Sequence, residues 1–334
     1  MLNGGVLLTI FLLVDISKSV LLSWSHANKT VSPSDFNVIF FKDILCMCVG
    51  FCWLLYHHSY HTIPLLQKNS SLFRIYLPIS LLFVCSQNCA FGALQLIDIG
   101  TFKLLLQACT PVTAILSYYL LFRIFNKREI YAICMVFVFS IVFYMVKFFV
   151  IEPTHYNSLL WGILYAIGFI ISSSLGGVVS EKVLKTHDSS LAVQYVYSKI
   201  ASVCISAFIF FINNSSNNFF ANFDYRTILV VIEYGISGFI VTAITKYISS
   251  TAKNITQAAS AAVAQLLTIV FASFAPNTIQ TESQSNVSLS NSNPFILICA
   301  AGIIASVVYF HISSQHHIRT NECELTDLEN RPSE

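Results

Sequence analysis

The sequence predicts an all-α membrane protein with ten transmembrane helices, and three observations support this fold class. Of the 334 residues, 55% are hydrophobic and only 10% are charged, with a mean hydropathy of +0.70. Such a chain has too little polar surface to cover a soluble globule of this length. Apolar runs of about 20 residues, long enough to cross a bilayer, follow one another along the chain. The connections between them are short and rich in turn-forming residues.

The first expected helix contains Asp15 and Lys18 and lacks a small-residue cleavage site, so we expect it to be retained rather than removed as a signal peptide. Polar turn formers separate the later helices, including Asn126-Lys127-Arg128 and the Asn/Ser run at 213–218. In chain order the expected spans are 4–24, 36–56, 75–96, 101–122, 130–150, 158–180, 191–212, 228–248, 254–275 and 294–314. No room remains for a soluble domain.

Two of the expected helices carry one polar pattern, T-x-K-x-x-x-Q-A-x-[T/S]. It begins at Thr101 in the fourth span and at Thr251 in the ninth. Five spans separate the copies, and an odd number turns the second copy over in the membrane, as in the inverted repeats of secondary transporters. We therefore predict two inverted five-helix repeats, 1–150 and 151–315, before an acidic cytosolic tail at 316–334. Chance similarity between two apolar helices is the alternative.

The charges of the loops predict the orientation. Lys and Arg accumulate in the cytosolic loops of membrane proteins, so we expect both termini to face the cytosol. The expected cytosolic residues are Lys68, Arg74, Arg123, Lys127, Arg128, Lys182, Lys185 and Lys253, whereas the opposite side has mainly Lys29 and Arg226. Three glycosylation sequons fall on that opposite side, at Asn28, Asn214 and Asn286.

Several lysines lie inside these apolar stretches. An unpaired ammonium at the centre of a membrane helix costs roughly 2.5 to 3.5 kcal/mol, so each of them needs a physical reason. An anionic substrate is the simplest one. Local pairing is the alternative for two of them, because Asp15 lies three residues before Lys18 and Asp43 directly follows Lys42. The lysines in question are Lys18, Lys42, Lys103, Lys199 and Lys246.

The repeated pattern places a lysine and a glutamine on one helix face in each half, Lys103 with Gln107 and Lys253 with Gln257. Lysine suits a phosphate because its compact charge and three donors sit on a flexible stem. We therefore expect these residues to line one binding cavity. The alternatives are an interfacial position for Lys253 and an ion pair between Lys103 and Asp98.

Further candidates lie in the third and seventh spans. The amides of Gln87 and Asn88 lie mid-span, where they would bind a base edge or hydrogen-bond another helix. Tyr195, Tyr197 and Lys199 crowd the start of the seventh span and offer a stacking surface and a cation. Interfacial aromatic residues are common in membrane proteins, which is the plainer explanation for the tyrosines.

Lys246, followed by Tyr247, has no acidic neighbour in the sequence and is the strongest single candidate for a functional charge. We expect no metal or cofactor. The cysteines form no C-x-x-C pair, and His57, His58 and His61 have no carboxylate or thiol nearby to complete a site. The net charge of +2 gives no reason to expect nucleic-acid binding.

Three elements carry a family resemblance. The first is residues 173–185, which begin at Ser173, read SSLGGVVSEKVLK and resemble the family element S-G-F-A-G-V-Y-F-E-K-I-L-K. The second is residues 246–253, which resemble the family element K-Y-A-D-N-I-L-K-G. Gln87 and Asn88 match a Q-N pair in the third helix. These elements are similar to those of the nucleotide-sugar transporters of the drug/metabolite transporter superfamily, in the group that carries CMP-sialic acid, UDP-galactose and UDP-N-acetylglucosamine.

The resemblance implies a Golgi or endoplasmic reticulum antiporter without enzymatic activity. It would lie in the lipid bilayer and exchange cytosolic nucleotide sugar for lumenal nucleoside monophosphate by alternating access. A monomer and a homodimer are both compatible with this function. This chain departs from the family at Cys109, where a lysine is expected, and at Ser249-Ser250, where Asp-Asn is expected. The sugar and base therefore cannot be transferred from the family.

Two other functions stay open. An organellar phosphate-ester or drug/metabolite carrier would share the repeat and the basic cavity. A multi-span membrane transferase would need a histidine or carboxylate at a membrane face, where only His155 with Glu152, and His311, are candidates.

Overall fold

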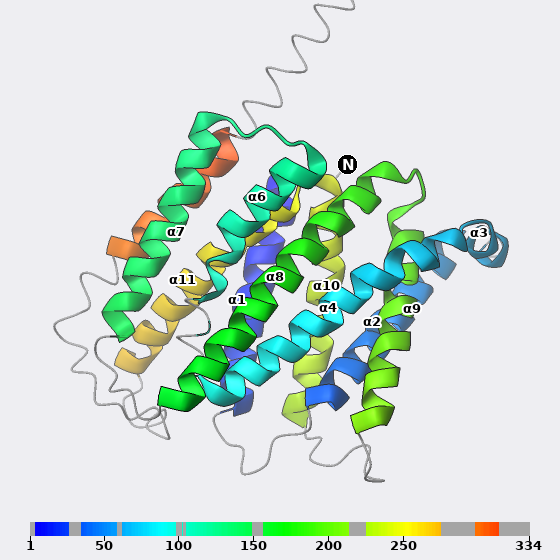
Figure 1. Cartoon of the computed structure of the whole chain (residues 1–334), viewed down its shortest axis with the longest axis horizontal. Helices are drawn as coiled ribbons and strands as arrows, with labels where there is room; N and C mark the ends of the chain where they lie inside the picture. Colours follow the sequence, from blue (N-terminus) through cyan, green and yellow to red (C-terminus); the bar gives the residue numbers. More distant parts are fainter. Residues whose placement is uncertain are drawn as a thin grey trace, which may run out of the picture.

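The computed structural model describes residues 4–26, 35–58, 62–97, 102, 105–148, 156–213, 225–274 and 298–313, and all regular structure in these residues is helical. Figure 1 shows a bundle of long helices in which successive helices run in opposite directions. Five helices in the described ranges are long and apolar enough to cross a membrane. The predicted class, an all-α polytopic membrane protein, is confirmed.

Each predicted span overlaps one helix, although α6 and the last helix are shorter than a full span in the described residues, and the short α3 is an addition that the sequence did not predict. The helices are α1 (Gly4–His26), α2 (Asp35–His58), α3 (Thr62–Lys68), α4 (Ser71–Leu96), α6 (Cys109–Leu121), α7 (Lys127–Phe148), α8 (Tyr156–Thr186), α9 (Leu191–Asn213), α10 (Tyr225–Tyr247) and α11 (Ser250–Phe274). A last helix covers Ile298–Ser313. The relation of the two halves as inverted repeats stays a prediction.

The fourth predicted helix starts later than we expected. α6 begins at Cys109 rather than at 101, and Gln107 and Ala108 form a turn before it. Pro111 lies in the first turn of α6, where its missing N–H costs no helical hydrogen bond; in a helix from 101 it would break the interior. The first copy of the repeated pattern therefore lies largely before α6, whereas the second lies within the first turns of α11.

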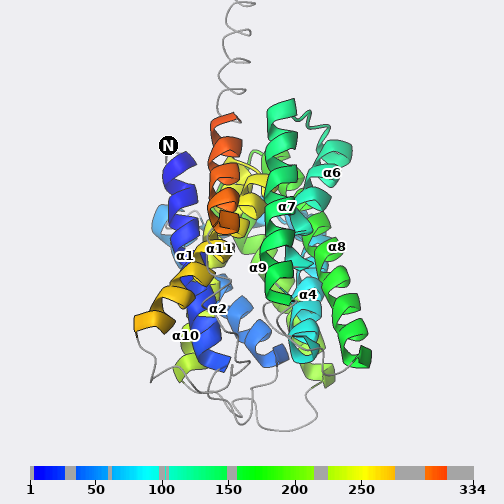
Figure 2. The ribbon, with the colours of Figure 1, turned by 90° about the vertical axis from the view of Figure 1, so that its left-hand side faces the viewer.

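The helices pack through small and apolar side chains. α4 packs against α8 and α9, α2 against α9, and α1 against α10 and α11. Gly50 of α2 touches the buried ring of Tyr195 in α9, and a Cβ there would lie 2.8 Å from Cδ1 of that ring. Small residues at such crossings let membrane helices approach closely. In Figure 1, α7 and the last helix lie on the left and α9 lies on the right. Figure 2 views the molecule from that left-hand side, with α1, α7 and the last helix toward the viewer.

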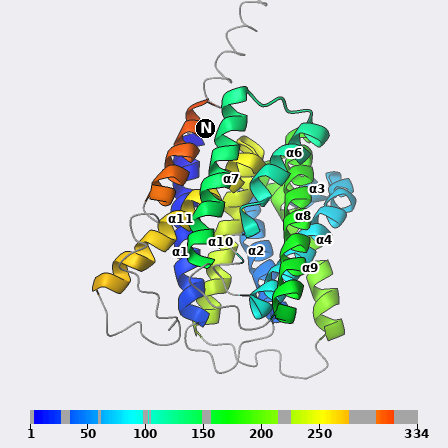
Figure 3. The same cartoon turned by 60° about the vertical axis from the view of Figure 1, so that its left-hand side comes forward.

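Both ends of the described bundle lie at one end of the molecule. The first turn of α1 and the final turn of the last helix are together there in Figures 1 and 2, and Figure 3 shows the same arrangement from an intermediate angle. The α6–α7, α8–α9 and α10–α11 connections share this end. It therefore carries basic residues that the sequence assigned to the cytosol, among them Arg123, Lys127, Lys182 and Lys185. We call it the basic end.

Candidate functional site

A cavity of about 350 Å³ lies inside the bundle and is lined by residues of α1, α2, α4, α6, α8, α9, α10 and α11. Among the described residues of its lining, four lysines and two aspartates are charged, which leaves a formal surplus of two positive charges. A surplus of this sign in a low-dielectric enclosure attracts anions. The charged residues are Lys18, Lys42, Lys199, Lys253, Asp15 and Asp43.

Lys42 is the fully paired lysine of the cavity. Its Nζ lies 3.0 Å from Oδ1 of Asp43 and donates a 2.6 Å hydrogen bond to Oε1 of Gln87, on α4. Lys42 and Asp43 are buried, where an uncompensated charge is expensive, and Gln87 is half-buried. The local pairing of Lys42 with Asp43 that the sequence offered as an alternative is therefore present. It leaves Lys42 with little free charge for a ligand.

Lys199 lies on the α9 wall of the cavity. Its Nζ is 5.5 Å from the ring centroid of Tyr195, one turn earlier on the same helix, within cation–π range. The ring of Tyr195 is buried and packs against Phe239 of α10, with 5.4 Å between centroids. Within the described part of the chain, the Lys199 ammonium makes no hydrogen bond or ion pair. It is therefore available to a ligand.

Lys18 of α1 brings another cation to the lining of the cavity. Its Nζ lies 4.3 Å from the ring centroid of Tyr234 on α10. Asp15, one turn earlier, accepts a hydrogen bond from Ser260 of α11, so this carboxylate joins two helices. Glu233 adds a negative charge near Lys18. Lys18 is therefore partly compensated by its surroundings although it forms no ion pair among the described residues.

Lys253 lies in the first turn of α11 and lines the cavity. Its charged neighbours are Lys18 and Asp15. No hydrogen bond or ion pair engages its ammonium within the described ranges. Lys199 and Lys253 are thus two lysines with uncommitted donors, contributed by different helices.

The ten predicted binding residues divide into three groups: five that line the cavity, one outside the described residues and four that do not line the cavity. Gln87, Gln107, Ser173, Lys199 and Lys253 line the cavity, as does Gln257. Lys103, the first lysine of the repeated pattern, lies outside the described residues. The first group comes from five different helices or turns, which sequence spacing alone could not bring together.

Four predicted residues do not line the cavity. Asn88 donates to the carbonyl of Val84 in its own helix at 3.0 Å, and the buried Tyr195 lies behind Lys199. Lys246 donates a 3.0 Å hydrogen bond to the carbonyl of Ser189 at the basic end, and Tyr247 is 67% exposed. Lys246 lacked an acidic neighbour in the sequence, but its partner is a backbone carbonyl, which sequence reasoning missed.

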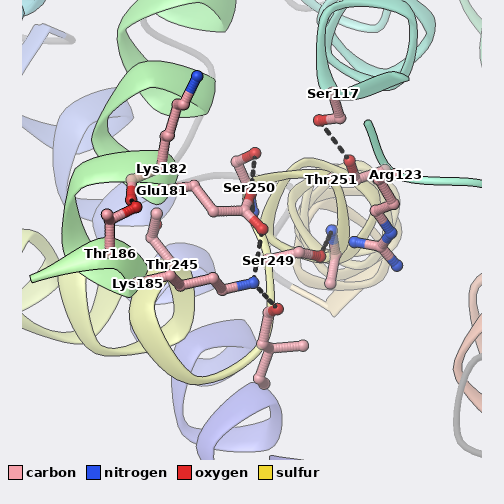
Figure 4. A network of polar contacts seen from close by, with 12 residues as sticks. Ser117, Arg123, Glu181, Lys182, Lys185, Thr186, Thr245, Ser249, Ser250 and Thr251 are labelled. Atoms are coloured by element: carbon pink, nitrogen blue, oxygen red, sulfur yellow. Dashed lines mark hydrogen bonds and ion pairs between the residues drawn. The ribbon is translucent and has the colours of Figure 1, made fainter. Parts of the chain in front are cut away.

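A polar network fixes α11 at one wall of the cavity (Figure 4). Oε2 of Glu181 accepts hydrogen bonds from the backbone N–H and the hydroxyl of Ser250, at 2.7 and 2.6 Å. Its Oε1 accepts a 2.7 Å bond from Lys185, which also donates to the carbonyl of Ile248 at 2.9 Å. Glu181 thus caps the first turn of α11 from α8. Ser250 lines the cavity, so the network positions that wall.

The fold and the cavity define a polytopic membrane protein with an internal cavity whose described lining carries a surplus of positive charge. The sequence pattern described as nucleotide-sugar transporter matches residues 25–285, which is more than half of the chain. The chain therefore belongs to the nucleotide-sugar transporter family, as the resemblance indicated. Membership assigns it a role in sugar transport across a membrane.

Structural comparison supports the fold. A solved chain described as a crystal structure of a protein superposes with a TM-score of 0.66 over 94% of this chain and 98% of the other, at 14% sequence identity. At this identity the likeness shows a shared fold and no more. None of the curated proteins compared with the chain matches it significantly.

Proposed function

We propose that the protein exchanges a nucleotide sugar for a nucleoside monophosphate by alternating access. The observation that carries the proposal is the surplus of two positive charges in the cavity lining. A phosphomonoester carries about 1.5 to 2 negative charges at neutral pH, so a nucleoside monophosphate compensates this surplus. A nucleotide sugar with a pyrophosphate brings a similar charge. Both partners of the exchange therefore suit one cavity.

Charge compensation also accounts for obligatory exchange. In the empty carrier, Lys199 and Lys253 are charged and have no ion pair among the described residues, and moving them through a dry gate is unfavourable. A bound dianion neutralises the cavity, so the loaded carrier reorients faster. We expect uptake into empty proteoliposomes to be much slower than into preloaded ones. Equal rates of net uptake and exchange would contradict this coupling.

The basic end supports an orientation with both termini in the cytosol. In a Golgi or endoplasmic reticulum membrane, the nucleotide sugar would then enter from the basic end and the nucleoside monophosphate would leave from the lumen. Glu181, Lys185 and Ser250 join α8 to α11 near the basic end and would hold that side of the cavity closed in one state.

Counterflow in proteoliposomes tests the exchange. The purified protein, preloaded with UMP, GMP or CMP, is offered a panel of radiolabelled nucleotide sugars. We expect one nucleotide to stimulate uptake, and Lys199→Met to abolish that stimulation because it removes a cavity cation. Lys182→Met is the matched control, since Lys182 is exposed and projects away from the network in Figure 4.

The Lys246→Met variant tests whether Lys246 binds substrate, as the sequence predicted, or lies outside the binding cavity, as in the structure. Lys246 bonds a backbone carbonyl outside the cavity, so we expect transport to change by no more than about twofold. Absence of counterflow with every nucleotide would contradict the proposed exchange and favour the organellar phosphate-ester carrier.

A further inference from the structure

We propose that Lys199, Tyr195 and the missing side chain of Gly238 form a subsite for one oxyanion group of the transported ligand. The chemical class is a phosphoryl or carboxylate oxygen. The identity of the ligand as a nucleotide rests on the function proposed above. The subsite specifies where the negative charge of the ligand is bound, and it identifies Gly238 as the residue that leaves space for that group.

The geometry centres on Gly238, in the interior of α10. Gly238 lines the cavity, and a Cβ built on it would lie 3.8 Å from Nζ of Lys199 and 3.9 Å from the hydroxyl oxygen of Tyr195. The Lys199 ammonium, which lines the cavity, and the Tyr195 hydroxyl, which lies just behind the lining, thus approach one point from α9. That point is occupied by no side chain, because glycine has none. The remaining neighbour is Sγ of Cys46, at 3.9 Å.

Neither donor around this point makes a hydrogen bond of full geometry to the described residues. The Tyr195 hydroxyl is buried, and its polar neighbour is the thiol of Cys46, a weak hydrogen-bonding group. Among the described residues, the Lys199 ammonium makes only the cation–π contact with the Tyr195 ring. Buried donors in native proteins are nearly always satisfied, and an unsatisfied one calls for a ligand or another explanation. An oxyanion beside Gly238 would accept from both donors.

The glycine itself supports the assignment. In a helix interior glycine is less favourable than alanine, because it loses more backbone freedom on folding. An alanine at 238 would meet its neighbours at ordinary van der Waals distances, so packing does not require glycine here. Gly235, one turn earlier, differs: a Cβ there would lie 3.3 Å from Cδ2 of Leu45, and the residue does not line the cavity. Space for a ligand accounts for Gly238.

The cavity lining also has an acidic group near Tyr195, the buried pair partner of Lys42. Asp43 lines the cavity and binds Lys42 through Oδ1, while its Oδ2 has no partner in the described residues. A carboxylate would repel an incoming oxyanion, and the pairing with Lys42 weakens this repulsion. We therefore place the oxyanion on the Gly238 side of the Lys199 ammonium, with Lys42 and Asp43 neutralising each other.

The test compares a nucleoside monophosphate with its own nucleoside, for binding to the purified full-length protein. Tyr195→Phe and Gly238→Ala should each weaken monophosphate binding by about tenfold, the effect of losing one charge-assisted hydrogen bond or its space. Nucleoside binding should stay unchanged, because the nucleoside has no oxyanion. Lys199→Met should remove most of the preference for the monophosphate. Gly235→Ala is the matched control: its Cβ requires only a small shift of the Leu45 side-chain tip and lies outside the cavity, so both ligands should bind as to the wild type.

Thermal unfolding in detergent separates binding from folding. Tyr195→Phe removes a hydroxyl that makes no hydrogen bond of full geometry to the described residues, and Gly238→Ala improves helix propensity, so neither should lower the unfolding temperature. If the variants weaken binding of an acidic nucleotide sugar but not of the monophosphate, the occupant is the carboxylate of the sugar. Wild-type affinity of both variants for both ligands would overturn the subsite. A wild-type protein that binds no nucleotide would instead overturn the proposed function.

Discussion

The Lys42 ammonium illustrates how much a single residue depends on its partners. It contacts the carboxylate of Asp43 and the amide of Gln87, and all three lie within the bundle. Asp43 is 1% exposed, so water cannot replace Lys42 as a partner. The pair is worth little compared with two apolar residues, but breaking it leaves one charge buried and alone. Lys42 and Asp43 therefore act on stability as a unit.

A pair of variants measures this unit. Lys42→Met should destabilise the protein by about 3 kcal/mol, because it leaves the Asp43 carboxylate without its cation. Lys42→Met combined with Asp43→Asn should recover most of the loss. Thermal unfolding in detergent checks both. If the double variant is as unstable as the single one, the pair does not explain the stability of this region.

The residue scale is also where the sequence was least informative. Gln107, Ser173 and Lys253 were predicted as binding residues and line the cavity, whereas Lys246 and Tyr247 were predicted and do not. Spacing gives the helix face on which a residue lies, but a helix that is apolar on all sides has no pattern that shows which face meets the cavity. Packing against neighbouring helices sets that rotation.

At the scale of elements, the junction of α10 and α11 is held by one carboxylate from α8. Glu181 is 1% exposed and accepts bonds from Ser250 and Lys185 (Figure 4). The sequence shows that Glu181 and Lys185 share a helix face, because they lie four residues apart. It does not show that the partner is the first residue of α11, which lies 69 positions later.

Removing this cap tests its role. Glu181→Ala takes away the acceptor of the Ser250 backbone N–H and leaves Lys185 with one carbonyl, so we expect a loss of about 2 kcal/mol in stability. Transport should also fall, because Ser250 and Lys253 line the cavity from this turn of α11. Lys182→Ala, on the exposed side of the same helix, should have no effect on unfolding. An unchanged unfolding temperature in Glu181→Ala would show that the cap is dispensable.

At the scale of the whole molecule, the ends of the helices alternate between two sides. The basic end carries both ends of the described bundle and the loops that the sequence assigned to the cytosol. Asn69 lies at this end, after α3. Asn254 lies in α11, where its amide donates to Thr113 at 2.7 Å. With the basic end in the cytosol, as proposed, neither asparagine would be glycosylated.

Glycosylation mapping in cells tests the orientation. We expect glycans at some or all of Asn28, Asn214 and Asn286, which lie outside the described residues, and none at Asn69 or Asn254. Removal of each sequon by Asn→Gln, followed by glycosidase treatment and a mobility assay, identifies the occupied sites. A glycan at Asn69 would place the basic end in the lumen and reverse the proposed direction of transport.

The sequence by itself determined the membrane class, the approximate positions of the long helices, the basic end and the family, because composition, apolar length and local motifs are properties of the chain. The tertiary structure decided which charges meet. It paired Lys42 with Gln87, joined Asp15 to Ser260, and brought Lys199 and Gly238 together from different helices. These contacts depend on the rotation and packing of each helix, which arise from distant partners rather than from local spacing.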